Sequence, residues 1–132
     1  MRYAYLDASA IAKLVVAEPE SGALQRDLAG RAGVLTSRLG AVEVRRAARR
    51  IRGSRVLQHA DGVLASFVLM ELSPPILERA SRVAPPELRT LDAIHLATAT
   101  MLVLPGVDFI TYDRRLAAAA TAAGLTVVQP GA

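Results

Sequence analysis

The sequence predicts a three-layer α/β fold around a parallel sheet. Short apolar runs alternate along the chain with segments that have the period of amphipathic helices. Parallel strands need a crossover connection, usually a helix, and this alternation supplies one after nearly every predicted strand. No internal repeat or linker divides the 132 residues, which is an ordinary length for one domain. We therefore expect a single domain spanning residues 1–132.

The second observation behind this fold is the segment 90–100, TLDAIHLATAT, which predicts a central helix. It is apolar or small on nearly every side, and helices of this kind are buried. Its one carboxylate, Asp92, needs a partner, because an ionised carboxylate without one is costly to bury. The first turn of the helix itself is one candidate partner, and a metal ion shared with other acids is another.

The remaining elements follow from apolar runs, capping residues and Gly or Pro breaks. Ser9 is the expected N-cap of the first helix, and Ser37 or Gly40 opens the helix that carries Glu43. Gly124 is expected at the C-terminal cap of the last helix. Strands are predicted at 3–6, 34–36, 108–111 and 126–128, an apolar run lies at 67–72, and further helices are predicted at 9–16, 23–28, 41–52, 54–66, 76–83 and 114–123.

The composition favours an anionic partner. Sixteen Lys and Arg residues against twelve Asp and Glu residues give a formal charge of +4, and Lys13 is the only lysine. Arginine binds phosphate in a bidentate way, which suits nucleic acid. The absence of cysteine excludes disulfides and thiolate chemistry and fits a reducing cytoplasm. Asp7 interrupts the first apolar run too early for a signal peptide, and no stretch is long enough to span a membrane, so we expect a soluble cytoplasmic protein.

Four acidic residues are predicted to gather at one edge of the sheet. Asp7 and Asp113 each follow a strand directly, where functional groups of parallel sheets collect, and Glu43 and Asp92 fall in the first turns of predicted helices. Four carboxylates at close range repel one another unless a cation neutralises them. All-oxygen clusters suit hard cations such as Mg²⁺ or Mn²⁺, which commonly meet phosphate substrates. The pattern therefore favours a metal site.

At these residues the chain resembles the PIN-domain ribonucleases, and more narrowly the VapC toxins of VapBC toxin–antitoxin pairs. The similarity runs nearly end to end and rests on YLDASA at 5–10, EV at 43–44, LDAIHLATA at 91–99, and TYDRRL at 111–116 ahead of Gly124. The resemblance implies a PIN-like α/β/α fold with a five-stranded parallel sheet. It also implies hydrolysis of RNA phosphodiesters with Mg²⁺, or Mn²⁺, as the cofactor.

The resemblance further implies roles for individual residues and partners. The carboxylates expected to bind metal and to be catalytic are Asp7, Glu43, Asp92 and Asp113, with the first and third as the most direct ligands. Ser9 and Thr111 are expected to support these acids through their hydroxyl groups. The implied partners are an RNA substrate, a VapB-type antitoxin that covers the first helices, and a second copy of the chain in a homodimer and in a toxin–antitoxin hetero-oligomer.

Other polar residues have a structural interpretation beside the functional one. Arg46 and Arg50 fall three and seven residues after the acid on their helix, so they either hold RNA phosphates or merely solvate an exposed face. His95 is expected to be a structural hydrogen-bonding residue rather than a ligand or base. Asp108 is expected to be a solvated turn residue, close enough to Asp113 to serve as a spare acid.

Two other classes of protein share parts of this pattern. Phosphotransfer domains of the receiver or haloacid-dehalogenase type also place Asp at strand ends over Mg²⁺. The second of these types needs an Asp two residues after the first, where this chain has Ser9. The remaining alternative is a non-catalytic PIN-like module that binds RNA or protein, and the complete set of four acids argues against it.

Overall fold

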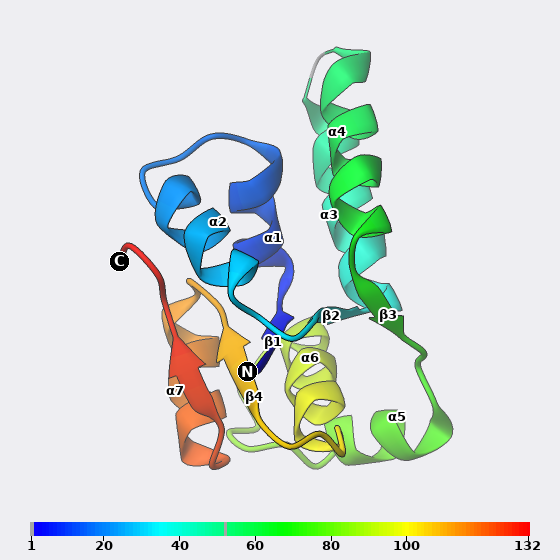
Figure 1. Ribbon diagram of the computed structural model, residues 1–132. Coiled ribbons are helices and arrows are strands. Elements are labelled where there is room, and N and C mark those ends of the chain that lie inside the picture. The colour runs from blue at the N-terminus through cyan, green and yellow to red at the C-terminus, as the bar shows by residue number, and fades with distance from the viewer. Residues whose placement is uncertain (1, 52) are drawn as a thin grey trace.

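The computed structural model describes residues 2–51 and 53–132, and in it a five-stranded, all-parallel sheet lies between two layers of helices (Figure 1). The strand order is β3-β2-β1-β4-β5, so the N-terminal strand is the central one. This arrangement confirms the predicted α/β class. The strands are β1 (Tyr3–Leu6), β2 (Val34–Ser37), β3 (Val68–Met70), β4 (Val107–Ile110) and β5 (Thr126–Val128).

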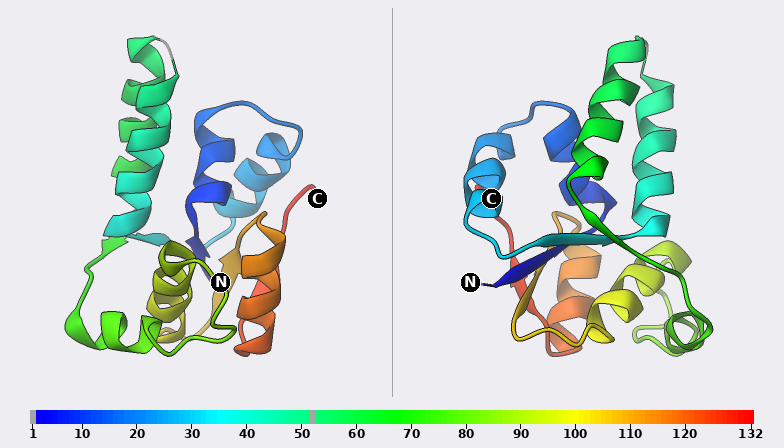
Figure 2. Two further views of the ribbon diagram at one scale, coloured as in Figure 1. Left: turned by 180° about the vertical axis from the view of Figure 1, so that it is seen from behind. Right: turned by 45° about the vertical axis from the view of Figure 1, so that its right-hand side comes forward.

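The helices divide between the two faces of the sheet, with α1 to α4 on one face and α5 to α7 on the other (Figure 1). Helices α3 and α4 pack against each other as a hairpin that stands out from the sheet (Figure 2). No helix in the described part of the chain has the length and apolar character that crossing a bilayer requires. The helices are α1 (Ala8–Val15), α2 (Ser21–Ala29), α3 (Arg38–Arg50), α4 (Ser54–Ala65), α5 (Pro74–Ala80), α6 (Thr90–Thr100) and α7 (Arg114–Ala122).

Strand β1 is buried on both of its faces, which fixes the point at which it ends. Ala4 and Leu6 pack into the core under α1, α3 and α4, whereas Tyr5 packs into the opposite core with Leu96 and Phe109. This alternation follows from the two-residue period of a strand. Full burial of a large apolar side chain such as that of Leu6 stabilises the fold by about 1.5–3 kcal/mol. The residue that follows β1 is therefore held at a defined place at the carboxyl edge of the sheet.

Two details of the helix starts differ from the sequence prediction. The N-cap of α1 is Asp7 rather than Ser9, because the Asp7 side chain accepts a hydrogen bond from the backbone N–H of Ala10 at 3.1 Å. Helix α3 begins at Arg38, with Ser37 as its N-cap. Glu43 therefore lies in the second turn of α3 and not in the first.

The other predicted helices and strands are confirmed with shifted ends. Helix α6 has the predicted bounds, residues 90–100. The predicted helix 41–52 ends at Arg50 among the described residues, and its predicted last residue, Arg52, lies outside them. The apolar run 67–72 contributes the edge strand β3.

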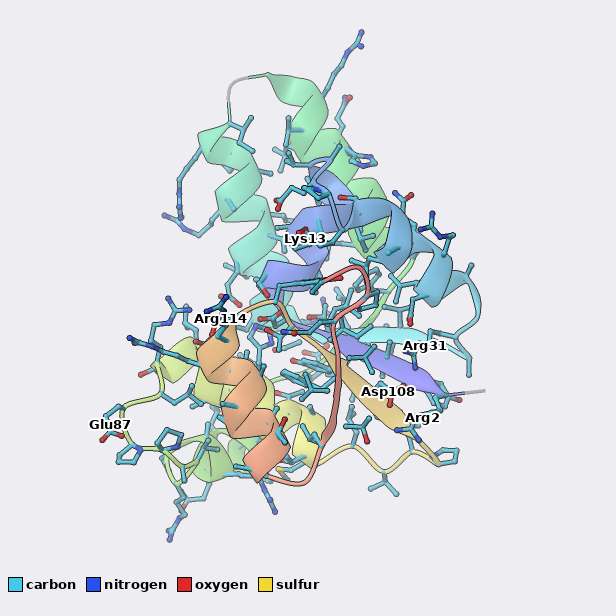
Figure 3. All side chains as sticks on the ribbon, turned by 90° about the vertical axis from the view of Figure 1, so that its left-hand side faces the viewer. Arg2, Lys13, Arg31, Glu87, Asp108 and Arg114 are labelled. Carbon is cyan, nitrogen blue, oxygen red and sulfur yellow. The ribbon has the colours of Figure 1, made fainter. Side chains whose placement is uncertain are left out.

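The prediction for Asp108 as a solvated turn residue or spare acid is wrong. Asp108 is the second residue of β4, is buried, and pairs in register with Ala4 of β1. The Nε atom of Arg2 donates to its Oδ1 at 2.8 Å, and Nη1 of Arg31 binds its Oδ2. Figure 3 shows these three residues together at one end of the sheet, away from Arg114 at the start of α7. Asp108 therefore connects Arg2, before β1, and Arg31, before β2, to β4 at the amino edge of the sheet.

We expect Asp108→Asn to lower the free energy of unfolding by about 2 kcal/mol near neutral pH, less than the loss typical of a fully buried pair, because Arg2 is half-exposed. Burial pushes the pKa of Asp108 upward, but the hydrogen bonds and charges of Arg2 and Arg31 outweigh burial and hold this pKa below its ordinary value. The stabilisation is thus present above the unfolded-state pKa of about 4 and is lost as the pH falls through the folded-state value.

Urea unfolding of the parent and of Asp108→Asn at neutral and acidic pH measures the difference in their free energies of unfolding. This difference should shrink toward zero in acid. Glu71→Gln is the matched control, since it breaks the exposed pair with Arg38 and should cost no more than about 1 kcal/mol. If Asp108→Asn were as stable as Glu71→Gln at neutral pH, the pairing of Asp108 with Arg2 and Arg31 would not stabilise the fold.

Candidate metal centre

Asp7 is the most enclosed of the four predicted acids, with 3% of its surface exposed. The hydroxyl of Ser9 donates to its carboxylate at 2.8 Å from Oδ1 and 3.0 Å from Oδ2, and the hydroxyl of Thr111 donates to Oδ2 at 2.8 Å. Burial raises the pKa of Asp7 above its ordinary value, against the opposing effect of these hydrogen bonds and of the nearby His95 ring. The structure thus brings both predicted hydroxyls to Asp7.

Asp113 lies at the same edge because Thr111 connects the two strand ends. The hydroxyl oxygen of Thr111, which donates to Asp7, also accepts from the backbone N–H of Asp113 at 3.1 Å. Asp113 is the N-cap of α7, and its Oδ1 accepts from the backbone N–H of Leu116 at 2.9 Å. Its second oxygen, Oδ2, is directed to the guanidinium of Arg89 at 3.3 Å. One oxygen of Asp113 is therefore structural, and the other faces the site.

Asp92 lies in the first turn of α6 and is bound by the same arginine. Nε of Arg89 donates to Oδ2 of Asp92 at 3.0 Å, while Nη2 of Arg89 reaches Asp113. Two carboxylates on different helices consequently share one cation. The two partners weighed for Asp92 from the sequence were the helix dipole and a metal ion, and the structure supplies a third, the side chain of Arg89.

Glu43 joins this edge through a buried relay of hydrogen bonds. Oε1 of Glu43 lies 2.6 Å from Nε2 of His95, and Nδ1 of the same ring lies 2.8 Å from the hydroxyl of Tyr5. Because a carboxylate only accepts, Nε2 is the donor, and in the neutral ring Nδ1 then accepts from the tyrosine. His95 therefore has the structural role predicted for it, and it also fixes the orientation of Glu43.

Gly40 allows α3 to approach α6 closely enough for this contact. A Cβ atom at position 40 would lie 2.5 Å from Oγ1 of Thr36 and 3.1 Å from Cε1 of His95. Thr36 has no freedom to move away, because it is buried and donates to the backbone oxygen of Leu6 at 2.7 Å. The glycine next to the helix start thus has a packing role that is not visible in the local sequence pattern.

The charges of the four acids shift the pKa values of Arg89 and Tyr5. Hydrogen bonding to Asp92 raises the pKa of Arg89, and the charges of Asp92, Asp113 and Glu43 add to this effect, against partial desolvation. Burial raises the pKa of Tyr5, with contributions from the charges of Asp7 and Glu43. Thr111 thus links Asp7 to Asp113, Arg89 links Asp113 to Asp92, and His95 holds Glu43 against α6, the helix that carries Asp92. The donors are all oxygens, which is the chemistry that Mg²⁺ and Mn²⁺ prefer.

Each carboxylate is nevertheless engaged by a protein donor. Within residues 2–51 and 53–132, no three His, Asp or Glu side chains are positioned to hold a metal ion as they stand. Asp92 and Asp113 are occupied by Arg89, Glu43 by His95, and Asp7 by hydroxyls. The oxygen donors thus fit a divalent cation, provided that the guanidinium of Arg89 leaves Asp92 and Asp113.

Three arginines remain to be placed relative to the acids, two that the sequence singled out and one that it did not. Arg46 and Arg50 are both exposed on α3, as either of their two interpretations requires. Arg89 was not among the predicted site residues. Arg89 lies three residues before Asp92, and residues three apart are neighbours on the surface of a helix. This spacing is the signal in the sequence that would have identified Arg89. Its bridge to Asp113 has no local signal, because the two residues lie 24 positions apart.

Comparison with known proteins defines the class. Residues 4–122 match the PIN domain family, so the chain belongs to that family. It is 44% identical over 135 residues to "Ribonuclease VapC46" and 42% identical over 131 residues to "Ribonuclease VapC35", both from Mycobacterium tuberculosis. Each alignment covers 96% of this chain and 96% of its relative. Within the PIN-domain family, the chain therefore belongs to the VapC ribonucleases.

Solved structures confirm the fold. The crystal structure of VapC20 from Mycobacterium tuberculosis, described as a Sarcin-Ricin loop cleaving toxin, has a TM-score of 0.74 at 21% identity and covers 96% of this chain and 99% of its own. A toxin–antitoxin complex from Klebsiella pneumoniae has a TM-score of 0.72 at 24% identity, covering 96% and 97%. The predicted PIN-like architecture is confirmed by both.

Proposed function

We propose that residues 1–132 form a single nuclease domain that hydrolyses RNA phosphodiesters at the four-acid site with Mg²⁺, or Mn²⁺, as the cofactor. In the cell this ribonuclease is the toxin of a type II toxin–antitoxin pair. The observation that supports this proposal most strongly is the convergence of Asp7, Glu43, Asp92 and Asp113 at the carboxyl edge of the sheet, in a chain that belongs to the VapC ribonucleases.

The residues of the site have different parts in this proposal. When bound, Mg²⁺ supplies positive charge at the scissile phosphate and makes a nearby water more acidic. Asp7 and Asp92 are the proposed direct ligands. Ser9 and Thr111 fix the orientation of the Asp7 carboxylate, as their hydrogen bonds indicate. Glu43, held by His95, and Oδ2 of Asp113, the oxygen that does not cap α7, are assigned to bind the metal through waters or to hold a second ion once Arg89 is displaced.

The RNA contact surface that we propose continues along α3. Arg46 and Arg50 are exposed on the helix that carries Glu43, and neither forms an ion pair with a described residue. Arg45 is different, because its Nε binds Oδ1 of Asp61 on α4 at 2.9 Å. We assign phosphate binding to Arg46 and Arg50, whose guanidinium groups have no such partner among residues 2–51 and 53–132.

The proposed protein partner is a VapB-type antitoxin. Several of the similar solved structures are toxin–antitoxin complexes, including one from Klebsiella pneumoniae and a DNA-bound VapBC from Salmonella typhimurium. In this chain a small apolar groove of about 80 Å³ lies between α1 and α3, next to Glu43. Val16 and Ile51 at its border are 40% and 43% exposed. An apolar antitoxin segment would cover this groove, and the homodimer implied by the resemblance stays a prediction.

RNA cleavage by the Glu43→Gln variant tests the proposed function. Gln keeps an oxygen that can accept from His95, so the fold should persist while one negative charge is lost. We expect the parent to cleave single-stranded RNA with Mg²⁺ or Mn²⁺ and not in chelator. We expect Glu43→Gln to be slower by at least about 100-fold, since partners outside the ligand set already account for 10–100-fold.

Glu71→Gln is the matched control, because it makes the same change in an exposed residue that pairs with Arg38. It should cleave like the parent. A parent protein that binds RNA but does not cleave it with either metal would favour the non-catalytic module instead.

A further inference from the structure

Arg89 occupies a capping position at which its side chain does not cap the helix. It is the N-cap residue of α6, with extended backbone angles, and it makes no side-chain cap hydrogen bond. Ser, Thr, Asp and Asn are the residues that stabilise such a position, because their short side chains accept from the free N–H groups of the first turn. The chain instead has a long cation there, and that cation extends to the acids of the proposed metal site.

The contacts of Arg89 are those of a counter-ion that can be exchanged. Its guanidinium binds Asp92 at 3.0 Å and Asp113 at 3.3 Å, yet its side chain is 72% exposed. An ion pair with one partner in water is weak and is readily replaced. A divalent cation brings twice the charge in a smaller volume, so it displaces the guanidinium from these oxygens. Arg89 keeps its charge at every accessible pH and then needs another anion.

A cleft lined by Arg89 itself offers that anion a place. The cleft has a volume of about 490 Å³, which lies in the range of small-molecule pockets. Its floor is formed by the small side chains of α7, and the loop before α6, which carries Glu87, runs beside this helix (Figure 3). Its charged lining residues are Glu87, Arg89, Asp92 and Arg115.

The second arginine of the cleft has no competing partner in the described structure. Arg115 is exposed and forms no ion pair with a described acid. The apolar part of the cleft comes from Leu88 and from Ala118, Ala119 and Ala122, whose short side chains leave space for a flat ring. Two guanidinium groups over an apolar floor match a nucleotide, with its phosphate at the rim and its base or ribose below.

We propose that Arg89 is a further RNA-binding residue, which neutralises Asp92 and Asp113 while no metal is bound and binds a phosphate over the cleft shared with Arg115 once a divalent cation takes those carboxylates. This inference rests on the proposed function, because it requires metal and RNA at the same site. It makes Arg89 the element that couples the two: metal binding releases the arginine, and the released arginine binds the substrate.

The test measures metal binding and RNA binding separately in Arg89→Ala and Arg89→Lys. Mn²⁺ affinity is measured by calorimetry without RNA. Removing the competing cation should tighten Mn²⁺ binding by roughly two- to fivefold, the fold-change that an exposed ion pair represents. Arg89→Lys keeps the charge but not the fork of donors, so its Mn²⁺ affinity should lie between those of the parent and Arg89→Ala.

RNA affinity is measured by anisotropy of a labelled single-stranded oligonucleotide, in chelator and in Ca²⁺, which takes the same oxygen ligands as Mg²⁺. In Ca²⁺, Arg89→Ala should bind RNA roughly five- to tenfold more weakly than the parent, as loss of a charged phosphate contact implies. In chelator the two proteins should bind RNA alike, because Arg89 is then held by the acids. Arg82→Ala is the matched control, since Arg82 is equally exposed and pairs with Glu78 on α5.

Several outcomes would overturn the inference. Unchanged Mn²⁺ affinity in Arg89→Ala would show that the arginine does not compete with metal. An equal loss of RNA affinity in chelator and in Ca²⁺ would make Arg89 an ordinary basic surface residue. If Arg89→Ala does not fold, Arg89→Lys carries the same comparison with smaller shifts. A parent protein that binds neither Mn²⁺ nor RNA would instead defeat the proposed function, whatever the variants do.

Discussion

In the Asp92→Asn variant, RNA cleavage should fall by at least about 100-fold, because a proposed direct ligand matters more than the supporting partners that account for 10–100-fold. The change preserves shape, since the Asn side chain keeps an oxygen that can accept from Nε of Arg89. It removes one of the negative charges that surround Arg89. Cleavage assays with Mg²⁺ and with Mn²⁺ measure the loss.

Thermal melting of the same variant separates a metal ligand from a helix-stabilising acid. The metal-free fold contains mutual repulsion of the acids, which Arg89 offsets only in part, because this exposed arginine contributes no more than about 1 kcal/mol. Asp92→Asn should therefore melt at the same or a higher temperature than the parent in chelator. The parent should gain about 2.7 kcal/mol at a metal concentration one hundred times the dissociation constant, and the variant should lose most of that gain.

If Asp92 only interacts with the dipole of α6, the Asp92→Asn variant should be less stable than the parent in chelator. Asn lacks the charge that interacts favourably with the start of α6, so stability would fall by ~0.3–1 kcal/mol with or without metal. Asp61→Asn is the matched control, because Asp61 is exposed on α4 and pairs with Arg45. An Asp92→Asn protein that is less stable in chelator and still gains as much as the parent from metal would exclude Asp92 as a ligand.

The sequence predicts those parts of the molecule whose cause is local. Residues 90–100 are apolar on nearly every side, and α6 has the bounds that this pattern predicts. Strand β1 and the acids that follow β1 and β4 are likewise visible, because a strand followed directly by an acid places it at the carboxyl edge of a parallel sheet. The link between Asp7 and Asp113 through Thr111 then follows from the strand order, in which β1 lies beside β4.

Where a prediction is wrong or incomplete, the deciding contact comes from the fold and not from the local pattern. Asp108 follows a loop and looks solvated, but its partners Arg2 and Arg31 lie 106 and 77 residues away. Ser9 is a good N-cap by residue type, yet its hydroxyl donates to Asp7, which takes the cap position instead. Short-range patterns identify which residues can act, and the fold decides with which partner each of them acts.

The His95→Ala variant should be less stable than the parent by about 3 kcal/mol, which combines the loss of a buried side chain with an unpaired tyrosine hydroxyl. His95 is 1% exposed, and Tyr5, whose hydroxyl lies 2.8 Å from Nδ1 of His95, is fully buried. The melting temperature should fall by roughly 10 °C for a chain of this size. His59→Ala is the matched control, since His59 is exposed and contacts the backbone oxygen of Leu14 at 2.9 Å, and its melting temperature should change little.

A double variant, Tyr5→Phe with His95→Leu, separates the stability of the core from the positioning of Glu43. Replacing Tyr5 and His95 together by apolar groups of similar shape leaves neither of these two buried partners unpaired, and the Glu43 carboxylate is partly exposed to water, so most of the lost stability should return. Phe at position 5 retains the stacking on Phe109, whose ring centroid lies 5.5 Å away. Cleavage should nevertheless stay at least about tenfold below the parent, because Glu43 lacks the donor that fixes its carboxylate. Recovery of full cleavage together with stability would mean that His95 acts only in the core and has no part in orienting Glu43.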